Sequence, residues 1–329
     1  MKERAYEIDV MKGIGILLVI LGHCMPDFPV NILEDPLSSE VRRFIYTFHM
    51  PMFFFCSGFV CGITPPHSKP LGKELSGRFW RLVVPYFVFS LVNLGLRLVF
   101  SSITRSDVDI METISKWFLY GGYYWFVYVL FILMFIVTLL KPTKWGKWVL
   151  IALSLVGIYV YYLRIQIFCL EEIGWYTLFV VLGFCLAKYR SNMLSVMKNY
   201  WIPACLTVLL VVLFFIISVP DKVTQFVPYY IQKLLMALIG LLAFYGFAVH
   251  PINNKKVSGF IEHFSKYSLQ YYLIHEITSL PCFYVVPALH LKASILAVLI
   301  NFVLVTLSSY LVLRIILLNK WCYKLVGIK

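Results

Sequence analysis

The sequence predicts an all-α integral membrane protein, a polytopic bundle of about ten transmembrane helices with the N-terminus and the C-terminus in the cytoplasm. Of its 329 residues 61% are hydrophobic, whereas about half are apolar in ordinary soluble domains. Only 14% are charged, against about a quarter in soluble domains, so the charges are too few to cover a globular surface. Apolar segments close to the length that spans a bilayer, about 20 residues, recur along the whole chain.

Ten apolar segments account for most of the chain. They are predicted to span the membrane at 8–27, 44–63, 82–103, 123–140, 148–163, 174–189, 201–219, 229–249, 268–287 and 295–318. The first segment lacks a small-residue cleavage site, so we expect it to stay as the first helix. No soluble domain or low-complexity tract interrupts the series, and residues 1–329 are therefore predicted to form one transmembrane domain.

The distribution of charge predicts the orientation, because cytoplasmic loops of membrane proteins collect Lys and Arg. With the N-terminus inside, the inside segments hold 19 of the 29 Lys and Arg residues and the outside segments hold 7. Acidic residues run the opposite way, with ten outside and five inside. This alternation favours ten spans. It also explains the net charge of +13 without nucleic acid as a partner.

The eight cysteines are scattered, most of them inside apolar segments, and none forms a Cys-x-x-Cys pair. We predict that they are buried thiols acting as small hydrophobic side chains, with no metal centre.

Polar residues in the first span lie where they are energetically costly, which makes them functional candidates. Lys12 and His23 are 11 residues apart, so they share a helix face about 16 Å apart along the axis. Asp9 lies within about 40° of His23 on the same helix. Two structural alternatives remain: Asp9 and Lys12 as an interfacial pair, and His23 as a packed histidine bonded to a neighbouring helix.

His49 in the second span is expected at nearly the same depth as His23. Pro51 removes a backbone hydrogen bond and is expected to kink the helix there. Two imidazoles at one level beside a kink indicate a polar pocket. Packing alone is the alternative.

Arg78 and Arg81 end the next cytoplasmic loop and are three residues apart, so they share a helix face. Planar guanidinium groups suit bidentate phosphate binding. Ordinary anchoring by positive charge on the inner side is the alternative.

The ninth span carries His275 and Glu276, which as neighbours do not share one helix face. We expect His275 to point inward, Glu276 to be satisfied by another helix, and the pair to lie nearer the cytoplasmic side.

Taken in order, these motifs resemble the membrane acyltransferase 3 family, whose best-known members O-acetylate sugars of bacterial surface polysaccharides. The resemblance covers nearly the whole chain. Within the family, the chain is most similar to the subgroup described as fucose 4-O-acetylase-like. The matching elements are Lys12 followed by ten residues and His23, the run Phe48–Phe59 with its His49 and Pro51, Arg78-x-x-Arg81 with Pro85-Tyr86, and Tyr272-Leu-Ile-His275.

The resemblance implies acetyl-CoA as the acyl donor and a multi-pass protein of the bacterial cytoplasmic membrane. Lys12, Arg78 and Arg81 would bind the polyanionic donor at the cytoplasmic side, and the late-helix match adds His275 to the donor-binding set. A pantetheine arm would bridge the distance of about 16 Å to His23.

The catalytic set implied is His23, Asp9 and His49. His23 would act as general base on a hydroxyl of an extracytoplasmic or lipid-linked sugar. His49 or the hydroxyl of Ser57 would stabilise the oxyanion, and Asp9 would hold Lys12 in place. A covalent acyl-His23 intermediate is the alternative mechanism.

Two other functions remain open at this level. One is a transporter or flippase for a glycan or lipid-linked precursor without chemistry, for which mirrored helix breaks in both halves would be expected. The other is the same scaffold transferring succinyl. Acceptor choice is expected to depend on the outer loops 28–43, 104–122 and 218–228, and no oligomeric state is predicted.

Overall fold

The structure is a computed structural model that describes residues 5–66, 68, 70–100, 108–217, 222 and 224–328, and it has no β-strand in these ranges. Parts of the predicted acceptor loops 104–122 and 218–228 lie outside the described residues. The same holds for the ends of the spans 82–103 and 201–219. Some of the charges counted for the orientation also lie outside them: Lys2, Glu3, Arg4, Lys69, Arg105, Asp107, Asp221 and Lys329.

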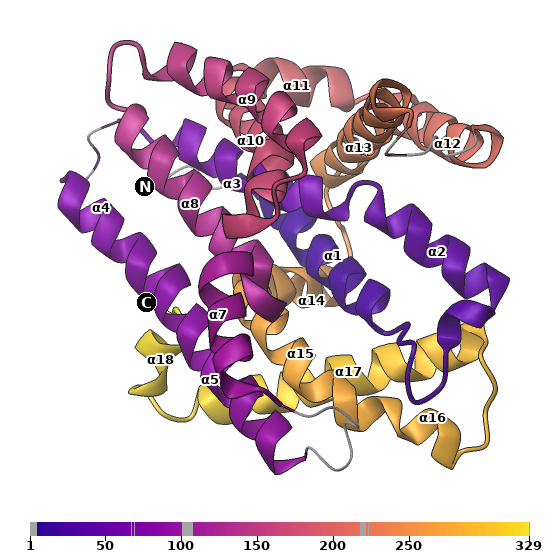
Figure 1. The fold of residues 1–329 in the computed structure, drawn as a ribbon. Coiled ribbons are helices and arrows are strands. Elements are labelled where there is room, and N and C mark those ends of the chain that lie inside the picture. The colour runs from indigo at the N-terminus through magenta and orange to yellow at the C-terminus, as the bar shows by residue number, and fades with distance from the viewer. Residues whose placement is uncertain are drawn as a thin grey trace.

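Helices make up the chain from its first described residues to its last (Figure 1). They are α1 Tyr6–His23, α2 Pro36–Tyr46, α3 His49–Ile63, α4 Leu71–Arg78, α5 Val84–Val99, α7 Ile110–Tyr120, α8 Trp125–Leu140, α9 Gly146–Leu163, α10 Leu170–Leu186, α11 Arg190–Met197, α12 Trp201–Ile216, α13 Phe226–Val249, α14 Lys255–Lys266, α15 Ser268–Phe283, α16 Val285–Ala288, α17 Ile295–Ile316 and α18 Cys322–Leu325.

Helix α1 lies at the centre of the bundle. It packs against α3, α13, α14 and α15, which belong to distant parts of the chain (Figure 1). Helix α3 packs in turn on α10, and α15 packs on α17. The first helix is therefore surrounded by protein, and its polar residues face other helices.

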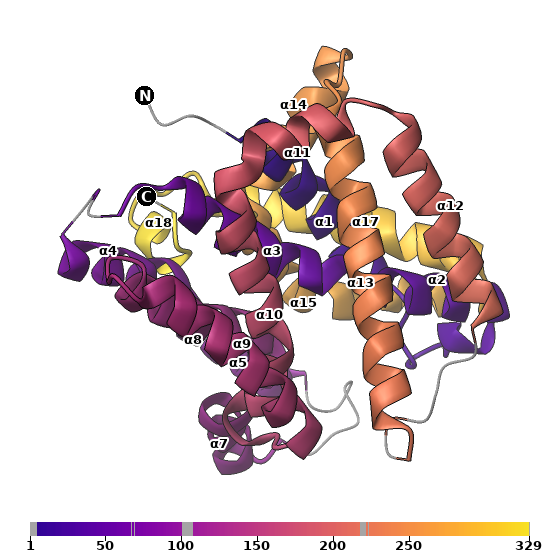
Figure 2. The ribbon, with the colours of Figure 1, turned by 90° about the horizontal axis from the view of Figure 1, so that it is seen from above.

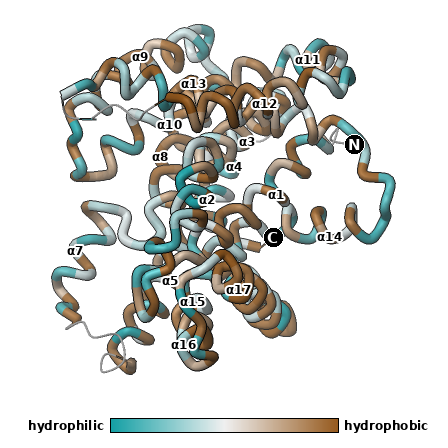
Figure 3. Tube along the Cα trace, turned by 90° about the vertical axis from the view of Figure 1, so that its right-hand side faces the viewer, coloured by the Kyte–Doolittle hydropathy of each residue, from teal (hydrophilic) through white to brown (hydrophobic). Residues whose placement is uncertain are grey.

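Each of the ten predicted spans overlaps helical structure, which confirms the all-α membrane class. Among the described residues, seven helical segments are long and apolar enough to cross a membrane by length and composition. Helix α12 is apolar but shorter, α15 has 16 residues, and α1 carries Glu7, Asp9 and Lys12. The number ten stays a prediction. Figure 3 shows hydrophobic positions dominating α12, α13 and α17.

The short connecting helices gather on two sides of the bundle. Figure 2 shows α4, α11, α14 and α18 along its upper and left margins, and α2 and α7 toward its right and lower margins. The first group lies in segments predicted to be inside and the second in segments predicted to be outside. The assignment of these two sides to the cytoplasm and the exterior, and with it the position of the termini, stays a prediction.

The second predicted span is broken earlier than expected. The chain leaves the helix at Thr47 and Phe48, and α3 begins at His49, so Pro51 lies in the first turn of α3. A proline there loses no helical hydrogen bond, because the first amide groups of a helix have no partner within it. The prediction of a kink at Pro51 is therefore wrong, and the break precedes it.

The arginine motif lies on a continuous helical rod, because α4 passes through a π-helix, Phe79–Val83, into α5. Pro85 lacks an amide hydrogen, and its ring would clash with the carbonyl of Arg81 four residues earlier. The wider turn relieves that clash. Arg78 and Arg81 thus lie immediately before and within the widened segment.

Two glycines let α3 and α10 touch through their backbones. A Cβ added at Gly58 would lie 2.0 Å from the Val180 carbonyl oxygen, and one at Gly183 would lie 2.2 Å from that of Phe55. Small residues permit such close approach between membrane helices. Helix α3 is therefore held in a fixed position against its neighbour.

Candidate functional site

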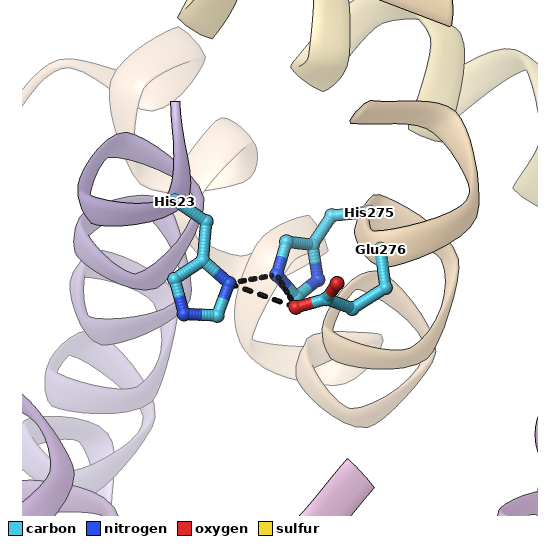
Figure 4. A group of neighbouring side chains, drawn as sticks. All are labelled: His23, His275 and Glu276. Atoms are coloured by element: carbon cyan, nitrogen blue, oxygen red, sulfur yellow. Dashed lines mark hydrogen bonds and ion pairs between the residues drawn. The ribbon is translucent and has the colours of Figure 1, made fainter. Parts of the chain in front are cut away.

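Two histidines and a glutamate from opposite ends of the chain meet between α1 and α15 (Figure 4). The His23 Nδ1 lies 2.7 Å from the His275 Nε2 and 3.0 Å from the Glu276 Oε1. The His275 Nε2 lies 3.6 Å from the same carboxylate oxygen. His23 is the last residue of α1, and the other two residues lie in the middle of α15. We call these three residues the histidine cluster.

The hydrogen bonds assign the protons on the two neutral rings. The His275 Nδ1 lies 3.1 Å from the Tyr271 carbonyl oxygen, which can only accept, so this nitrogen is the donor. The His275 Nε2 is then an acceptor, and the His23 Nδ1 donates to it and to Glu276. In that tautomer the His23 Nε2 carries a free lone pair. A ring oriented in this way is suited to take a proton from a hydroxyl group.

Exposure distinguishes the members of the cluster. The side chain of His275 is fully buried, whereas 34% of the His23 side chain and 22% of the Glu276 side chain are exposed. A substrate can therefore reach His23, while His275 supports it from behind. Glu276 adds a carboxylate that stabilises positive charge on the ring during proton transfer.

The same three side chains offer one ligand atom each, all within 4.8 Å of one another, and a two-histidine, one-glutamate set occurs in zinc enzymes. Two nitrogens bound to one tetrahedral zinc would lie about 3.3 Å apart. The observed 2.7 Å between the His23 and His275 nitrogens is instead the length of a strong hydrogen bond. The geometry therefore favours a hydrogen-bonded proton relay.

His49 lies on the far side of Tyr46 from His23. The Tyr46 ring is 4.8 Å from the His49 ring and 6.5 Å from the His23 ring, measured between centroids. The His49 Nδ1 donates to the Ile45 carbonyl, and the Ser57 hydroxyl donates to the Phe53 carbonyl. Neither the neutral histidine nor the serine thus has a free hydrogen for an oxyanion. His49 packs behind the site and does not touch His23 directly.

A cavity of about 290 Å³ follows α1 below the histidine cluster. On α1 it is lined by Lys12, Ile16 and Val19, which lie on one helix face. The opposite walls come from α3, from α8 and from the rod that carries Arg78 and Arg81. The structure thus brings the predicted donor-binding residues of α1 and of the arginine motif together. We call this space the inner cavity.

The inner cavity carries an excess of positive charge. Its lining contains four basic residues and one acidic residue: Lys12, Lys73, Arg78, Arg81 and Glu74. Arg78 donates to Glu74 at 3.0 Å, and its Nε is buried without a hydrogen-bond partner. Lys12 and Arg81 form no ion pair with any described residue. An excess of positive charge of this kind suits a polyanionic ligand.

The inner cavity ends close to the histidine cluster. Val19, its last lining residue on α1, precedes His23 by four residues, which is about 6 Å along the helix. Met50, next to His49, lines the same end. A thin ligand with an anionic head at the arginines therefore reaches to within about one helical turn of His23.

Two predicted site residues lie elsewhere. Asp9 lines a small recess with Ser258 and Ile261 of α14, and it lies about 21 Å from His23 along α1. His275, assigned to donor binding, does not line the inner cavity, although Tyr272 one turn earlier does.

We expected His275 and Glu276 to lie nearer the cytoplasmic side, and in the structure both contact His23, the last residue of α1. The side on which they meet stays a prediction. Helix α15 has only 16 residues, so its midpoint is within about 12 Å of either end. In the sequence, His275 and Glu276 lie in the first half of the predicted span 268–287. The structure instead brings the end of α1 against the middle of α15.

The sequence reasoning missed the pairing of Glu276 with His23. It expected another helix to satisfy Glu276, and α1 does so. A signal was available, because Glu276 is an acidic residue well inside the predicted span 268–287. A buried carboxylate in a membrane needs a specific partner, and histidine is a natural one.

Comparisons with known proteins bear on this site. A family model described as an acyltransferase domain matches residues 5–314. The nodulation protein NolL of Sinorhizobium fredii (strain NBRC 101917 / NGR234) is 24% identical over 216 residues, which is 62% of this chain and 56% of NolL. The match thus spans little more than half the length of that relative. No solved structure matches the chain.

Proposed function

The chain belongs to the acyltransferase family, and from that premise we propose that it transfers an acetyl group from cytoplasmic acetyl-CoA to a hydroxyl of an extracytoplasmic or lipid-linked sugar. The site of action is the bacterial cytoplasmic membrane. The observation that carries the proposal is the histidine cluster, in which the His23 Nε2 is left free about one helical turn beyond a basic cavity.

The inner cavity is the binding site for the donor. Phosphates of the nucleotide bind Lys12, Arg78 and Arg81, of which two have no carboxylate partner among the described residues. The pantetheine arm runs along Ile16 and Val19 toward His23. The apolar walls exclude water from the thioester and so limit its hydrolysis.

The reaction needs one proton relay. The His23 Nε2 accepts the proton of the sugar hydroxyl, and the hydroxyl oxygen attacks the thioester carbonyl carbon. The carbon–sulfur bond breaks as the tetrahedral intermediate collapses. The leaving thiolate takes the proton back from His23, which gives free CoA and the O-acetyl ester. Glu276 and His275 hold the ring and stabilise its charged form.

His49 is proposed to position the site. Its ring packs on Tyr46, which borders His23, so it fixes the wall beside the reacting atoms. Asp9 is proposed to act at the basic end of α1, since Asp9 and Lys12 lie within one turn of the same helix.

Transfer in proteoliposomes tests the proposal. The purified chain is given acetyl-CoA on one side and cell-surface glycan on the other, and O-acetyl ester and free CoA are measured. We expect both products from the native chain and neither from His23→Ala. A transporter would move glycan without releasing CoA, and that result would overturn the proposal. The mass added to the glycan distinguishes acetyl from succinyl.

A single-turnover reaction distinguishes the two mechanisms. With donor alone, a covalent route leaves an acyl group on His23 that mass spectrometry of the acid-quenched peptide detects. Direct transfer leaves His23 unmodified and gives product only after the glycan is added.

A further inference from the structure

A second pocket, distinct from the inner cavity, has Tyr46 in its lining. Its volume is about 440 Å³, and it is formed by α2, α12 and α13. It shares no lining residue with the inner cavity. Because α2 lies in a segment predicted to be outside, we call this space the outer pocket.

Three basic side chains line the outer pocket, and no carboxylate does: the three are Arg42, Arg43 and Lys233. Segments predicted to be outside hold only 7 of the 29 Lys and Arg residues, so positive-inside anchoring does not explain this concentration. Lys233 lies within a predicted span, where a cation is costly and usually functional.

Two of these cations lack a carboxylate partner among the described residues. The Lys233 ammonium donates to the Tyr161 hydroxyl at 2.9 Å and lies 4.3 Å from the Trp175 ring centroid. The nearby Glu171 is paired with Lys222 instead. The Arg42 guanidinium lies over the Tyr46 ring, 5.2 Å from its centroid. Arg43 differs, because it pairs with Glu40 at 2.5 Å on the same helix.

The remaining lining suits a sugar. Gln232 presents a buried Oε1 that has no hydrogen-bond partner in the described part of the chain. A sugar hydroxyl is a natural donor to that oxygen. Tyr229 and Phe214 provide aromatic faces on which a sugar ring can pack.

The outer pocket connects to the histidine cluster through Tyr46. The Tyr46 ring lines the pocket, supports Arg42 on one side and approaches His23 at 6.5 Å between ring centroids. Tyr46 is thus the residue that the lining of the outer pocket shares with the surroundings of His23.

We propose that the outer pocket binds a carboxylate or phosphate of the acceptor glycan, so that the acceptor is an anionic sugar whose neighbouring hydroxyl is presented to His23. This inference rests on the proposed function, since it names the substrate class of the same site. Arg42 and Lys233 hold the anion, and Gln232 accepts from a sugar hydroxyl.

Binding by the full chain in phosphatidylcholine nanodiscs tests the inference without an identified acceptor. CoA is kept saturating, so that the inner cavity is occupied. The probes are glucuronate, inorganic pyrophosphate and, as the neutral control, methyl glucoside. We expect the two anions to bind and to lose affinity about tenfold or more in Arg42→Gln and in Lys233→Gln. Lys292→Gln, which removes an exposed positive charge outside the pocket, should bind as the native chain does.

The outcomes separate the sources of the anion. Loss of glucuronate binding in the two variants indicates an acidic sugar, and loss of pyrophosphate binding indicates a phosphate linkage; either supports the inference. Equal affinity in native and variant chains, or no anion binding by the native chain, overturns it. Competition by phosphatidylglycerol alone, with both anions inactive, marks a lipid site and also overturns it.

Acyl transfer provides an independent readout. CoA release that depends on His23 measures the proposed function without reference to the acceptor's charge. If that release persists while Arg42→Gln and Lys233→Gln bind anions normally, the acceptor inference fails and the proposed function stands. If anion binding is lost in these variants but no CoA release is found, the proposed function fails instead.

Discussion

The inner cavity and the outer pocket are both basic, but their charges differ in what they reveal. The inner cavity has four basic residues, one of which pairs with Glu74, on the side predicted to be cytoplasmic, where membrane proteins collect positive charge in any case. The outer pocket has three basic residues without a carboxylate in its lining, on the side predicted to be outside, where the segments are otherwise rich in acidic residues. Location therefore makes the outer charges the more specific sign of a ligand.

The comparison also separates binding from chemistry. The two spaces share no lining residue, and the histidine cluster is in neither lining. Substitutions in the cluster should therefore slow the reaction, whereas substitutions in either space should weaken one substrate. Four tests, taken from the largest expected effect to the smallest, examine that separation.

His23→Ala removes the base that both spaces serve. We expect transfer to fall by about 10²- to 10⁴-fold, because proton transfer by a positioned group contributes that much. Donor and glycan binding, measured by equilibrium titration, should stay close to native. If binding of either substrate falls as far as the rate, the separation of binding from chemistry is wrong, because His23 would then belong to one of the binding sites.

Glu276→Gln removes the charge that faces the His23 Nδ1 but keeps the shape of the side chain. We expect kcat to fall by about 10- to 100-fold, less than for His23→Ala, because His275 still accepts from His23. KM for donor and glycan should not change. Glu276→Asp should recover part of kcat, and a variant that merely misfolds would show no such recovery.

Lys12→Gln and Arg81→Gln each remove an unpaired cation from the inner cavity. We expect KM for acetyl-CoA to rise about tenfold with kcat little changed, since a charge-assisted hydrogen bond contributes about that much. KM for the glycan should stay native. Lys144→Gln, an exposed cation in a loop predicted to be on the same side, is the matched control. An equal rise in glycan KM would mean that the two spaces are coupled.

Arg43→Gln sharpens the comparison within the outer pocket. This arginine is bound to Glu40, and its side chain is 40% exposed. We expect glycan KM to change less than about threefold, because exposed ion pairs contribute little. The same assay on Arg42→Gln should show the larger effect. Equal effects would indicate that total charge, rather than the unpaired guanidinium of Arg42, holds the anion.

Local pattern predicted much of this arrangement. The helices follow from apolar segments of membrane length, and the face shared by Lys12 and His23 follows from helical geometry alone. The two arginines of the motif line the same cavity as Lys12, as expected for one binding site. These features depend on spacing within one helix or on the sidedness of loops.

Local sequence patterns could not predict contacts between helices that are distant in the chain. His23 and His275 are 252 residues apart, and their meeting depends on how α1 crosses α15. The helix break depends on where the chain turns from α2 into α3. The proline predicted a kink at Pro51, whereas the break lies between Tyr46 and His49. Asp9 was assigned to catalysis by its angle on α1, yet the rise of the helix takes it about 21 Å from His23.

Helix α3 is packed more tightly than helix α4, and this contrast bears on how the proposed donor leaves the inner cavity. Helix α4 buries none of its residues, yet it contributes Lys73, Glu74 and Arg78 to the inner cavity. One wall is thus held against α10 through glycine contacts, and the opposite wall continues into the π-helix without a buried residue of its own. If the proposed donor leaves past α4, its departure needs the outward motion of only one short helix. We expect that motion to limit the cycle on the microsecond-to-millisecond scale typical of gating segments.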